Sequence, residues 1–232
     1  MLNTSKRRLY LSAWFFKNSP KEFFASLKLQ KFLFFYEIFN YSLDNEIHLD
    51  YLKGYKNGPV YSDVYGDYTY RMEEFQTKLE EIISGVKDKV ALNVFEPVNE
   101  DIAKKAAFLV SVLSKSELSE LSHEFDIWKN KEARIESGEK QVKLELEDLS
   151  SKDKSLAKEL YDLYSLDFID NSFVISVNET KFIIDKSQRS QVTSELEEVL
   201  EEISKEEEDN PVYISIEDGV IVVDDWRWRN KT

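Results

Sequence analysis

Residues 26–41 read SLKLQKFLFFYEIFNY, an almost continuous apolar block. The polar interruptions are too frequent for a segment that spans a bilayer, whereas the length suits a buried helix. Its apolar residues would cover two faces of that helix, with Leu29, Phe32, Leu33 and Tyr36 on one and Phe35 and Phe39 on the other. We therefore expect a central helix of a soluble domain, covered on most sides.

A Gly-Pro pair follows this block within residues 55–65, which read YKNGPVYSDVY. Glycine allows an unrestricted φ and proline suits the first turn of a helix, so Gly58 and Pro59 are expected to end one element and to lead into the next. Residues 44–55 are polar and irregular, with Ile47, Leu49, Tyr51 and Leu52 as the inward residues. We expect a helix over residues 61–83, with a possible break at Gly66 and an end near Gly85.

Composition restricts the chemistry and the compartment. A chain of 232 residues can bury roughly 70% of its unfolded surface, so the size of the core is not limiting. It contains no cysteine and two histidines, which excludes disulfides and leaves little material for a transition-metal site. The first residues lack the pattern of a signal peptide and no segment reaches spanning length. We expect a cytoplasmic protein that needs no cofactor, metal or membrane.

The formal net charge of −14 is unevenly distributed. Residues 1–116 carry a net charge of +1 and the remainder carries −15. An acidic field of this kind repels nucleic acid phosphates and favours a basic protein partner. The alternative is that the acidic half is only a well-solvated surface.

Further helices are expected before residue 166. The first spans residues 4–16 and stops at Pro20. Asn99 caps another that runs to Leu113, and residues 153–164 form the last. Residues 86–97 are expected to be a loop or a brief strand. Ser116 is the expected N-cap of a helix with one apolar side, formed by Leu118, Leu121, Phe125 and Trp128.

The pattern changes to strands after residue 166. Residues 173–177 and 181–184 flank a three-residue turn, and residues 212–216 and 220–223 flank a turn that contains Asp-Gly, a strong hairpin signal. Between them, residues 191–205 predict an acidic helix with an apolar stripe, formed by Val192, Leu196, Val199, Leu200 and Ile203. The expected fold class is α+β, with a mainly helical domain over residues 1–166 and a hairpin–helix–hairpin appendage over residues 167–232. The four strands could form one sheet against the stripe.

Three motifs stand in a fixed order along the helical part. They are LKLQKFLFF at residues 27–35, YKNGPVYSDVY at residues 55–65, and LSELSH at residues 118–123 with Trp128 five residues on. This order and spacing resembles the SocA-like antitoxin domain, also called Panacea, over about residues 1–164. The chain departs from the family at Asn57, where an aromatic residue is usual, and at Ile127, where proline is common.

The resemblance implies a non-catalytic protein that binds and neutralises a protein toxin encoded next to it. Because members of the family are paired with unrelated toxins, the resemblance does not name the partner. We hypothesise that the helical domain is the common scaffold and that the acidic appendage helps to select the partner through its charge. Removing residues 167–232 would then weaken binding.

The candidate partner-binding residues fall into three groups. Lys28, Gln30 and Lys31 would contact a partner or hold the Gly58 turn, or would extend their polar ends from the edge of the core. The Gly-Pro region contributes Tyr55, Gly58, Pro59, Tyr61 and Tyr65. The third group contains His123, Trp128, Trp226 and Trp228. The alternating aromatic and basic residues at the C-terminus could dock in a protein groove or stack on bases, or could cover the core of the appendage.

A catalytic function is the less favoured interpretation. Asp63 and Asp67 have the i,i+4 spacing of a carboxylate pair, but a chain with 45 acidic residues supplies many such spacings by chance. His123 could be a metal ligand or a base, yet Ile127 stands where a zinc-protease motif needs its second histidine. A histidine bonded near the Gly-Pro turn or Trp128 is favoured. The principal functional alternative is a phage or mobile-element protein that inhibits a nucleic-acid-binding defence protein by acidic mimicry.

Overall fold

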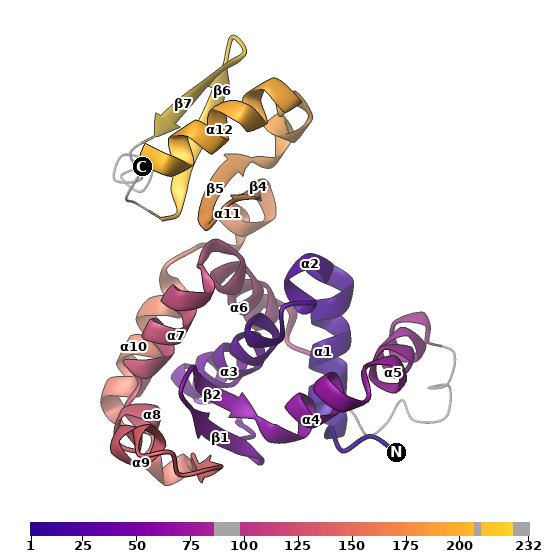
Figure 1. Cartoon of the computed structure of the whole chain (residues 1–232), viewed down its shortest axis with the longest axis vertical. Helices are drawn as coiled ribbons and strands as arrows, with labels where there is room; N and C mark the ends of the chain where they lie inside the picture. Colours follow the sequence, from indigo (N-terminus) through magenta and orange to yellow (C-terminus); the bar gives the residue numbers. More distant parts are fainter. Residues whose placement is uncertain (86–97, 207–209, 225–232) are drawn as a thin grey trace. The chain divides into compact units, whose positions relative to one another are not determined.

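The structure is a computed structural model that describes residues 1–85, 98–206 and 210–224. It divides into two compact units, each with its own internal contacts. Unit 1 comprises Met1–Val110 and Lys115–Leu163, and unit 2 comprises Ser111–Ser114 and Tyr164–Thr232. The expected α+β class is confirmed, with a helical N-terminal part and a C-terminal sheet of hairpins with a helix between them (Figure 1).

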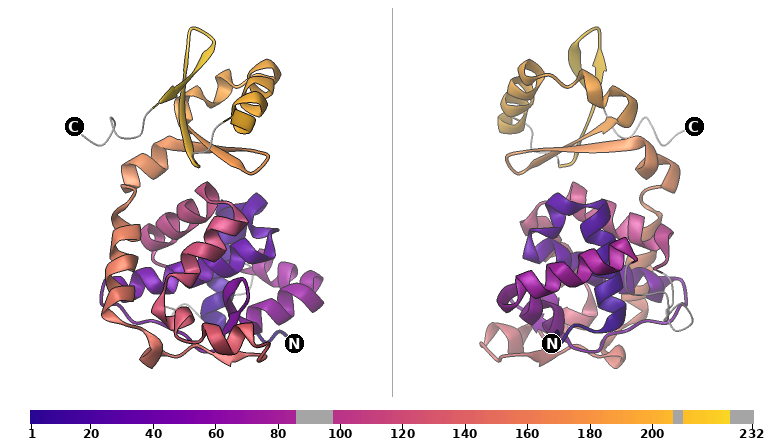
Figure 2. Two further views of the ribbon diagram at one scale, coloured as in Figure 1. Left: turned by 60° about the vertical axis from the view of Figure 1, so that its left-hand side comes forward. Right: turned by 90° about the vertical axis from the view of Figure 1, so that its right-hand side faces the viewer.

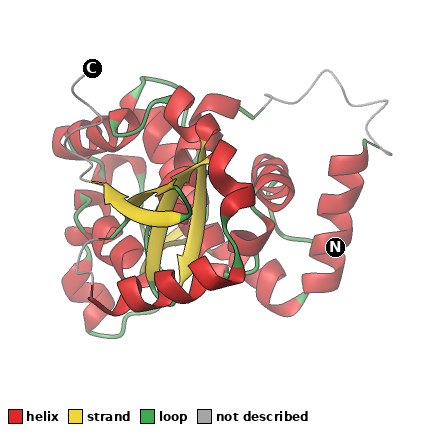
Figure 3. Cartoon of the chain, turned by 90° about the horizontal axis from the view of Figure 1, so that it is seen from above, coloured by secondary structure: helices red, strands yellow, loops and turns green. Residues whose placement is uncertain are grey.

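Unit 1 is mostly helical, and helices, red in Figure 3, make up most of the described chain. Its helices are α1 (Lys6–Asn18), α2 (Pro20–Phe23), α3 (Ser26–Ser42), α4 (Ser62–Tyr70), α5 (Met72–Ser84), α6 (Glu100–Val112), α7 (Lys115–His123), α8 (Asp126–Lys129), α9 (Glu132–Glu136), η2 (Leu146–Asp148) and α10 (Ser151–Asp162). Its strands are β1 (Leu52–Tyr55), β2 (Gly58–Tyr61) and β3 (Val142–Lys143).

Helix α3 is the centre of unit 1, as the apolar block predicts. Every residue from Lys28 to Asn40 is buried, the polar ones included. The helix contacts α1, α2, α4, α7, α10 and β2. Aromatic rings join these layers, because Phe32 stacks on Phe15 at 4.3 Å between ring centroids and Phe34 meets Phe125 edge to face at 5.5 Å. Burial of this surface is the main stabilising contribution to the unit.

A small antiparallel sheet replaces the irregular connection expected before Gly58. Its strand order is β2-β1-β3, so that β2 is an edge strand. Gly58 and Pro59 lie within β2 rather than at the start of a helix. An edge strand tolerates proline because the missing N–H would face away from the ladder. Tyr51, expected to point inward, is 60% exposed.

The following helices differ from expectation in where they break. The helical region after β2 breaks at Arg71, between α4 and α5, rather than at Gly66. Helix α7 begins at Lys115, so Ser116 lies in its first turn and donates to the Glu120 carboxylate instead of capping. The chain breaks again after His123, which places Trp128 on the separate helix α8. Asn99 accepts from the N–H of Ile102, as expected of a cap. The residues 86–97 lie outside the described part of the chain.

Unit 2 contains one four-stranded sheet with a helix on one face (Figure 2). Its elements are α11 (Leu166–Asn171), β4 (Ser172–Val177), β5 (Thr180–Asp185), η3 (Lys186–Gln191), α12 (Ser194–Glu206), β6 (Val212–Glu217) and β7 (Val220–Asp224). The order is β4-β5-β6-β7, with both hairpins antiparallel and β5 parallel to β6. The single sheet is therefore confirmed, and α12 is the crossover between its two hairpins.

The predicted stripe of α12 packs on this sheet, with one exception. Leu200 joins Phe182 and Ile214 in the buried core, while Leu196 and Ile203 pack at its margin. Val199 is 44% exposed and does not belong to the stripe. The first hairpin turns over two residues rather than three, since Val177 pairs directly with Thr180. No helix in the described part of the chain is long and apolar enough to cross a membrane.

Candidate functional site

The turn between β1 and β2 is held from inside by side chains of α3, α7 and α8. The indole Nε1 of Trp128 donates to the carbonyl oxygen of Tyr55 at 2.9 Å, and Lys31 Nζ donates to that of Asn57 at 2.5 Å. His123 forms a hydrogen bond with the backbone of Lys56. Three successive residues of the turn are thus bound by three side chains. We call Lys31, Ser122, His123 and Trp128 the turn clamp.

Gly58 allows the turn to approach the clamp closely. Its φ of +97° is strained for any residue with a side chain. A Cβ at this position would lie 2.2 Å from Lys31 Nζ and 2.2 Å from Ser122 Oγ. These two atoms are themselves 2.6 Å apart, because Lys31 donates to the Ser122 hydroxyl. Only glycine fits both the backbone geometry and the space.

Burial changes the electrostatics of the clamp. Lys31 is 1% exposed, and desolvation lowers the pKa of its amine from 10.5 to about 7. Burial also lowers the pKa of His123, as does the charge of Lys31, although the Lys56 backbone raises it. The His123 ring stacks on Trp128 at 3.7 Å between centroids, and its Nε2 has no hydrogen-bond partner among the residues described. The histidine therefore lies where its sequence context favours, against Trp128 and the turn.

Gln30 fixes the other end of β2. Its Oε1 accepts from the N–H of Tyr61 at 2.7 Å, and its Nε2 donates to the Tyr61 carbonyl at 3.4 Å. The amide side chain thus pairs with an edge strand as a neighbouring strand would. Tyr61 is fully buried and donates its hydroxyl to the carbonyl of His48. Desolvation raises the pKa of this phenol well above its ordinary value.

The remaining polar residues of α3 are also paired inside unit 1. Lys28 pairs with Glu22 at 2.5 Å, and Glu37 pairs with Arg7 at 2.8 Å. Lys28, Gln30 and Lys31 are each 5% exposed or less. They are therefore buried in the core rather than extended from its edge. Gln30 and Lys31 hold β2 and its turn, which is one of the roles expected of this group.

The tyrosines of the Gly-Pro region divide between inside and outside. Tyr61 is buried, whereas Tyr65 is 38% exposed and Tyr55 is half-buried. The Tyr55 and Tyr65 rings lie 6.2 Å apart. The clamp therefore grips the backbone of Tyr55 while its side chain faces outward. Trp226 and Trp228 lie outside the described residues.

Two arrangements could suggest catalysis, namely the contact between Lys31 and Ser122 and the Asp63–Asp67 pair. Each has a structural explanation. Lys31 and Ser122 have the contact distance of a Ser–Lys dyad, but Ser122 is fully buried and its Oγ donates to the Ser119 carbonyl at 2.8 Å. A substrate carbonyl has no path to this hydroxyl in the structure. No group of His, Asp and Glu side chains among the residues described could hold a metal ion.

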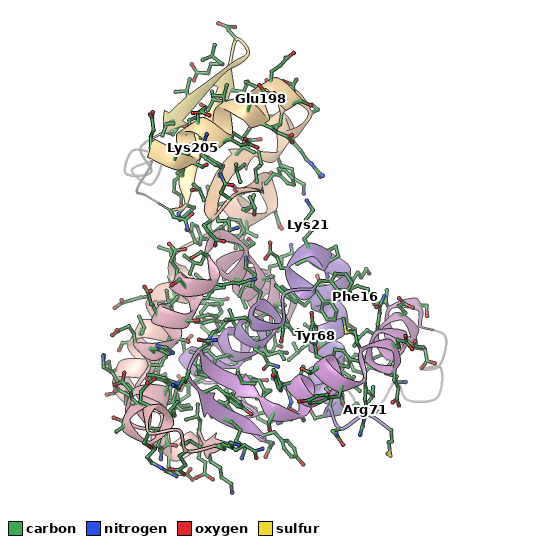
Figure 4. The ribbon with its side chains drawn as sticks, viewed as in Figure 1. Phe16, Lys21, Tyr68, Arg71, Glu198 and Lys205 are labelled. Carbon is green, nitrogen blue, oxygen red and sulfur yellow. The ribbon has the colours of Figure 1, made fainter. Side chains whose placement is uncertain are left out.

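The Asp63–Asp67 pair fastens the N-terminus to α4. Asp67 Oδ2 accepts from the backbone N–H of Thr4 at 2.7 Å and from its hydroxyl at 2.7 Å. Asp63 pairs with Arg8 at 2.8 Å, and both side chains are almost fully buried. Arg71, labelled in Figure 4, pairs with Asp67 and donates to the Met1 carbonyl. Both carboxylates are thus engaged by the chain's own backbone and cations.

Sequence reasoning missed the clamp role of Ser122 and the hairpin itself. The dipeptide Asn57-Gly58 is a hairpin signal that could have revealed the turn. Ser122 carries no comparable signal, since it meets Lys31 only through the fold.

In the comparisons with known proteins, no family model, curated protein or solved structure matches this chain.

Proposed function

We propose that this protein is a non-catalytic antitoxin, which neutralises a cognate protein toxin by binding it directly. The observation that carries the proposal is the meeting of the three motifs in one place. Lys31 and Gln30 come from the first motif, Gly58 from the second, and His123 and Trp128 from the third. The residues that resemble the SocA-like (Panacea) domain thus form one scaffold around the β1–β2 turn.

This arrangement suits a binding protein because the buried clamp makes the surface of the β1–β2 turn rigid while the clamp residues themselves stay inside the fold. The clamp satisfies the turn carbonyls from inside, so the outward side chains are held before a partner arrives. Holding a binding surface in advance reduces the entropy lost on association.

Unit 2 adds a second recognition element in this proposal. Helix α12 presents exposed glutamates, including Glu195, Glu198 and Glu202, and we propose that they select a partner with a basic region. Figure 4 shows Glu198 and Lys205 as labelled side chains of this helix. Replacing Glu195, Glu198 and Glu202 with lysine should weaken binding, most strongly at low salt.

The test of the proposed function is a growth assay with the protein encoded by the neighbouring open reading frame. Expressed alone it should stop growth, and co-expression of this protein should restore growth and give a complex that co-purifies. A neighbour that is harmless, or one that stays toxic while both proteins are folded and abundant, would overturn the proposal.

A second candidate function is inhibition of a nucleic-acid-binding defence protein by acidic mimicry. It is favoured by the exposed carboxylates on α12, among which Glu195, Glu197 and Glu198 have no ion pair in the described structure. Mimicry predicts that DNA competes for the partner and that binding falls steeply with salt. Binding that DNA does not compete would exclude it.

A further inference from the structure

The small sheet of unit 1 carries two lysines directly across from each other. Lys53 on β1 and Lys143 on β3 are register partners, so their side chains lie on the same face. Like charges in this position repel each other and destabilise the sheet. In the described part of the chain neither lysine has a carboxylate partner. Lys131, by contrast, pairs with Asp148 at 2.7 Å.

The charge of this face is not balanced by the acids of the adjoining helix. Asp63 and Asp67 of α4 point inward and bind the N-terminal segment and Arg8. Lys56, at the tip of the turn, is exposed and has no ion pair among the residues described. Three lysines with no ion pair among the residues described therefore lie on β1, its turn and β3, in a chain whose net charge is −14.

Aromatic and apolar groups flank the lysines. Tyr55 lies two residues from Lys53 on the same strand, hence on the same face, and contacts Tyr65. A groove of about 370 Å³ is lined by Lys53 and Lys143 themselves, by another residue of β1 and by the segments next to these strands. Leu146 and Tyr51 border it and are 55% and 60% exposed.

Two carboxylates also line the groove. Asp50 is exposed, and Glu145 accepts a hydrogen bond from the backbone of η2 as part of a capping box. Lys53 and Lys143 line the same groove and form no ion pair with either carboxylate among the residues described, and Lys56 lies at the tip of the adjoining turn. We call these three lysines with Tyr55 and Tyr65 the basic face.

We propose that the basic face binds an acidic segment of the partner protein. Carboxylates of the segment would relieve the repulsion between Lys53 and Lys143, and the tyrosines would supply apolar contact with little loss of side-chain entropy. The proposal deepens the antitoxin function and rests on it. With the acidic α12, it gives the protein two surfaces of opposite charge for one partner.

A protein segment fits this face better than a nucleic acid does. Nucleic acid affinity comes from many phosphate contacts, and residues 117–232 carry a net charge of −15 that repels a polyanion. A short acidic segment needs only the local charge of the face. The clamp supports this use, because it fixes the backbone at Tyr55 and Asn57 directly beneath the face.

The test is a charge reversal with a matched control. The variant Lys53→Glu/Lys143→Glu changes the basic face. The control Lys17→Glu/Lys115→Glu makes the same change in charge at exposed lysines on α1 and α7. Circular dichroism and thermal melting establish that both are folded. Binding is measured by fluorescence anisotropy with a labelled peptide rich in glutamate and leucine, with a labelled oligo-dT, and with the product of the neighbouring gene.

We expect the face variant to bind the peptide and the neighbour's product at least about tenfold more weakly than the wild type, and the control to bind within about twofold. Equal binding by the face variant and the control overturns the proposal, as does a wild type that binds oligo-dT more tightly than the peptide or fails to bind the peptide. If the neighbour's product binds the wild type and the face variant equally, the basic face fails while the antitoxin function stands. If the neighbour's product binds neither the wild type nor the face variant, but the labelled peptide binds the wild type and not the face variant, the antitoxin function fails and the binding site stands.

Discussion

Replacing Lys31 with methionine should remove a specific dependence of stability on pH. The amine is buried with two hydrogen-bond partners, the Asn57 carbonyl and the Ser122 hydroxyl, and without a carboxylate among the residues described. Desolvation lowers its pKa from 10.5 in the exposed state to about 7 in the folded state. Between these values the unfolded chain binds more protons than the folded chain, so the free energy of unfolding must rise with pH.

The size of the rise follows from the same two pKa values. One pKa unit corresponds to about 1.4 kcal/mol. Between about pH 7 and pH 9 the unfolded amine stays protonated while the folded amine loses the rest of its charge, which should increase the free energy of unfolding by about 2 kcal/mol. Lys31→Met has no such amine and should lack this increase. Any misfit of the methionine side chain in the clamp lowers the stability of the variant by the same amount at every pH, so it does not change the slope.

The assay is urea unfolding at several pH values, followed by tryptophan fluorescence in a background with Trp226 and Trp228 replaced by phenylalanine. Trp128, part of the clamp, then contributes to the signal. The matched control is Lys28→Met, which removes another buried lysine, the partner of Glu22, and retains the Lys31 amine. It should keep the wild-type rise. If the free energy of unfolding changes with pH in parallel for the wild type and Lys31→Met, the conclusion that the Lys31 amine is buried away from water is refuted.

Three further substitutions, two of them with a matched control, test the local structure by thermal and urea unfolding. Gly58→Ala should lower the free energy of unfolding by about 3 kcal/mol, because it combines a left-handed φ with a Cβ 2.2 Å from clamp atoms. Its control, Gly66→Ala, lies in a helix with open space around it and should raise the free energy of unfolding by about 0.5 kcal/mol. Equal effects of the two substitutions would contradict the clamp. Trp128→Phe removes the donor to the β1 carbonyl and should cost about 1–2 kcal/mol, and no loss would show that this bond is not formed. Asp67→Asn should cost about 2 kcal/mol of stability, because it weakens the hydrogen bonds to the N-terminal segment. Its control, Asp162→Asn, removes a charge at an exposed ion pair and should cost less than about 0.5 kcal/mol. Similar losses in the two variants would argue against the N-terminal attachment.

The central helix could be predicted from sequence because its signal is local. Apolar residues on more than one side of residues 26–41 require burial, and α3 is buried from Lys28 to Asn40. The sheet of unit 2 was predictable for the same reason, since each hairpin carries its own alternation and turn. The β1–β2 hairpin was missed because Pro59 suggested a helix start. An edge strand accommodates this proline, and that position depends on the whole sheet.

The candidate site could be predicted as a set of residues but not as an arrangement. The three motifs were recognisable in order, yet Lys31 and Ser122 are separated by 91 positions and meet only through packing. A lysine in an apolar helix is also expected to reach water, because burying an amine is costly. Here the turn carbonyl and a hydroxyl satisfy it. The pairing of Lys53 with Lys143 likewise depends on β3, a two-residue strand with no pattern of its own.

The most direct test of the account, in which the basic face of unit 1 contacts the partner, is hydrogen–deuterium exchange of this protein with and without the product of the neighbouring gene. The account predicts that the partner slows exchange of the β1 strand and its turn, residues 52–57, and of β3 at Lys143. These segments carry the basic face that the clamp supports. A complex that forms with unchanged exchange in these segments, and with protection confined to unit 2, would contradict it.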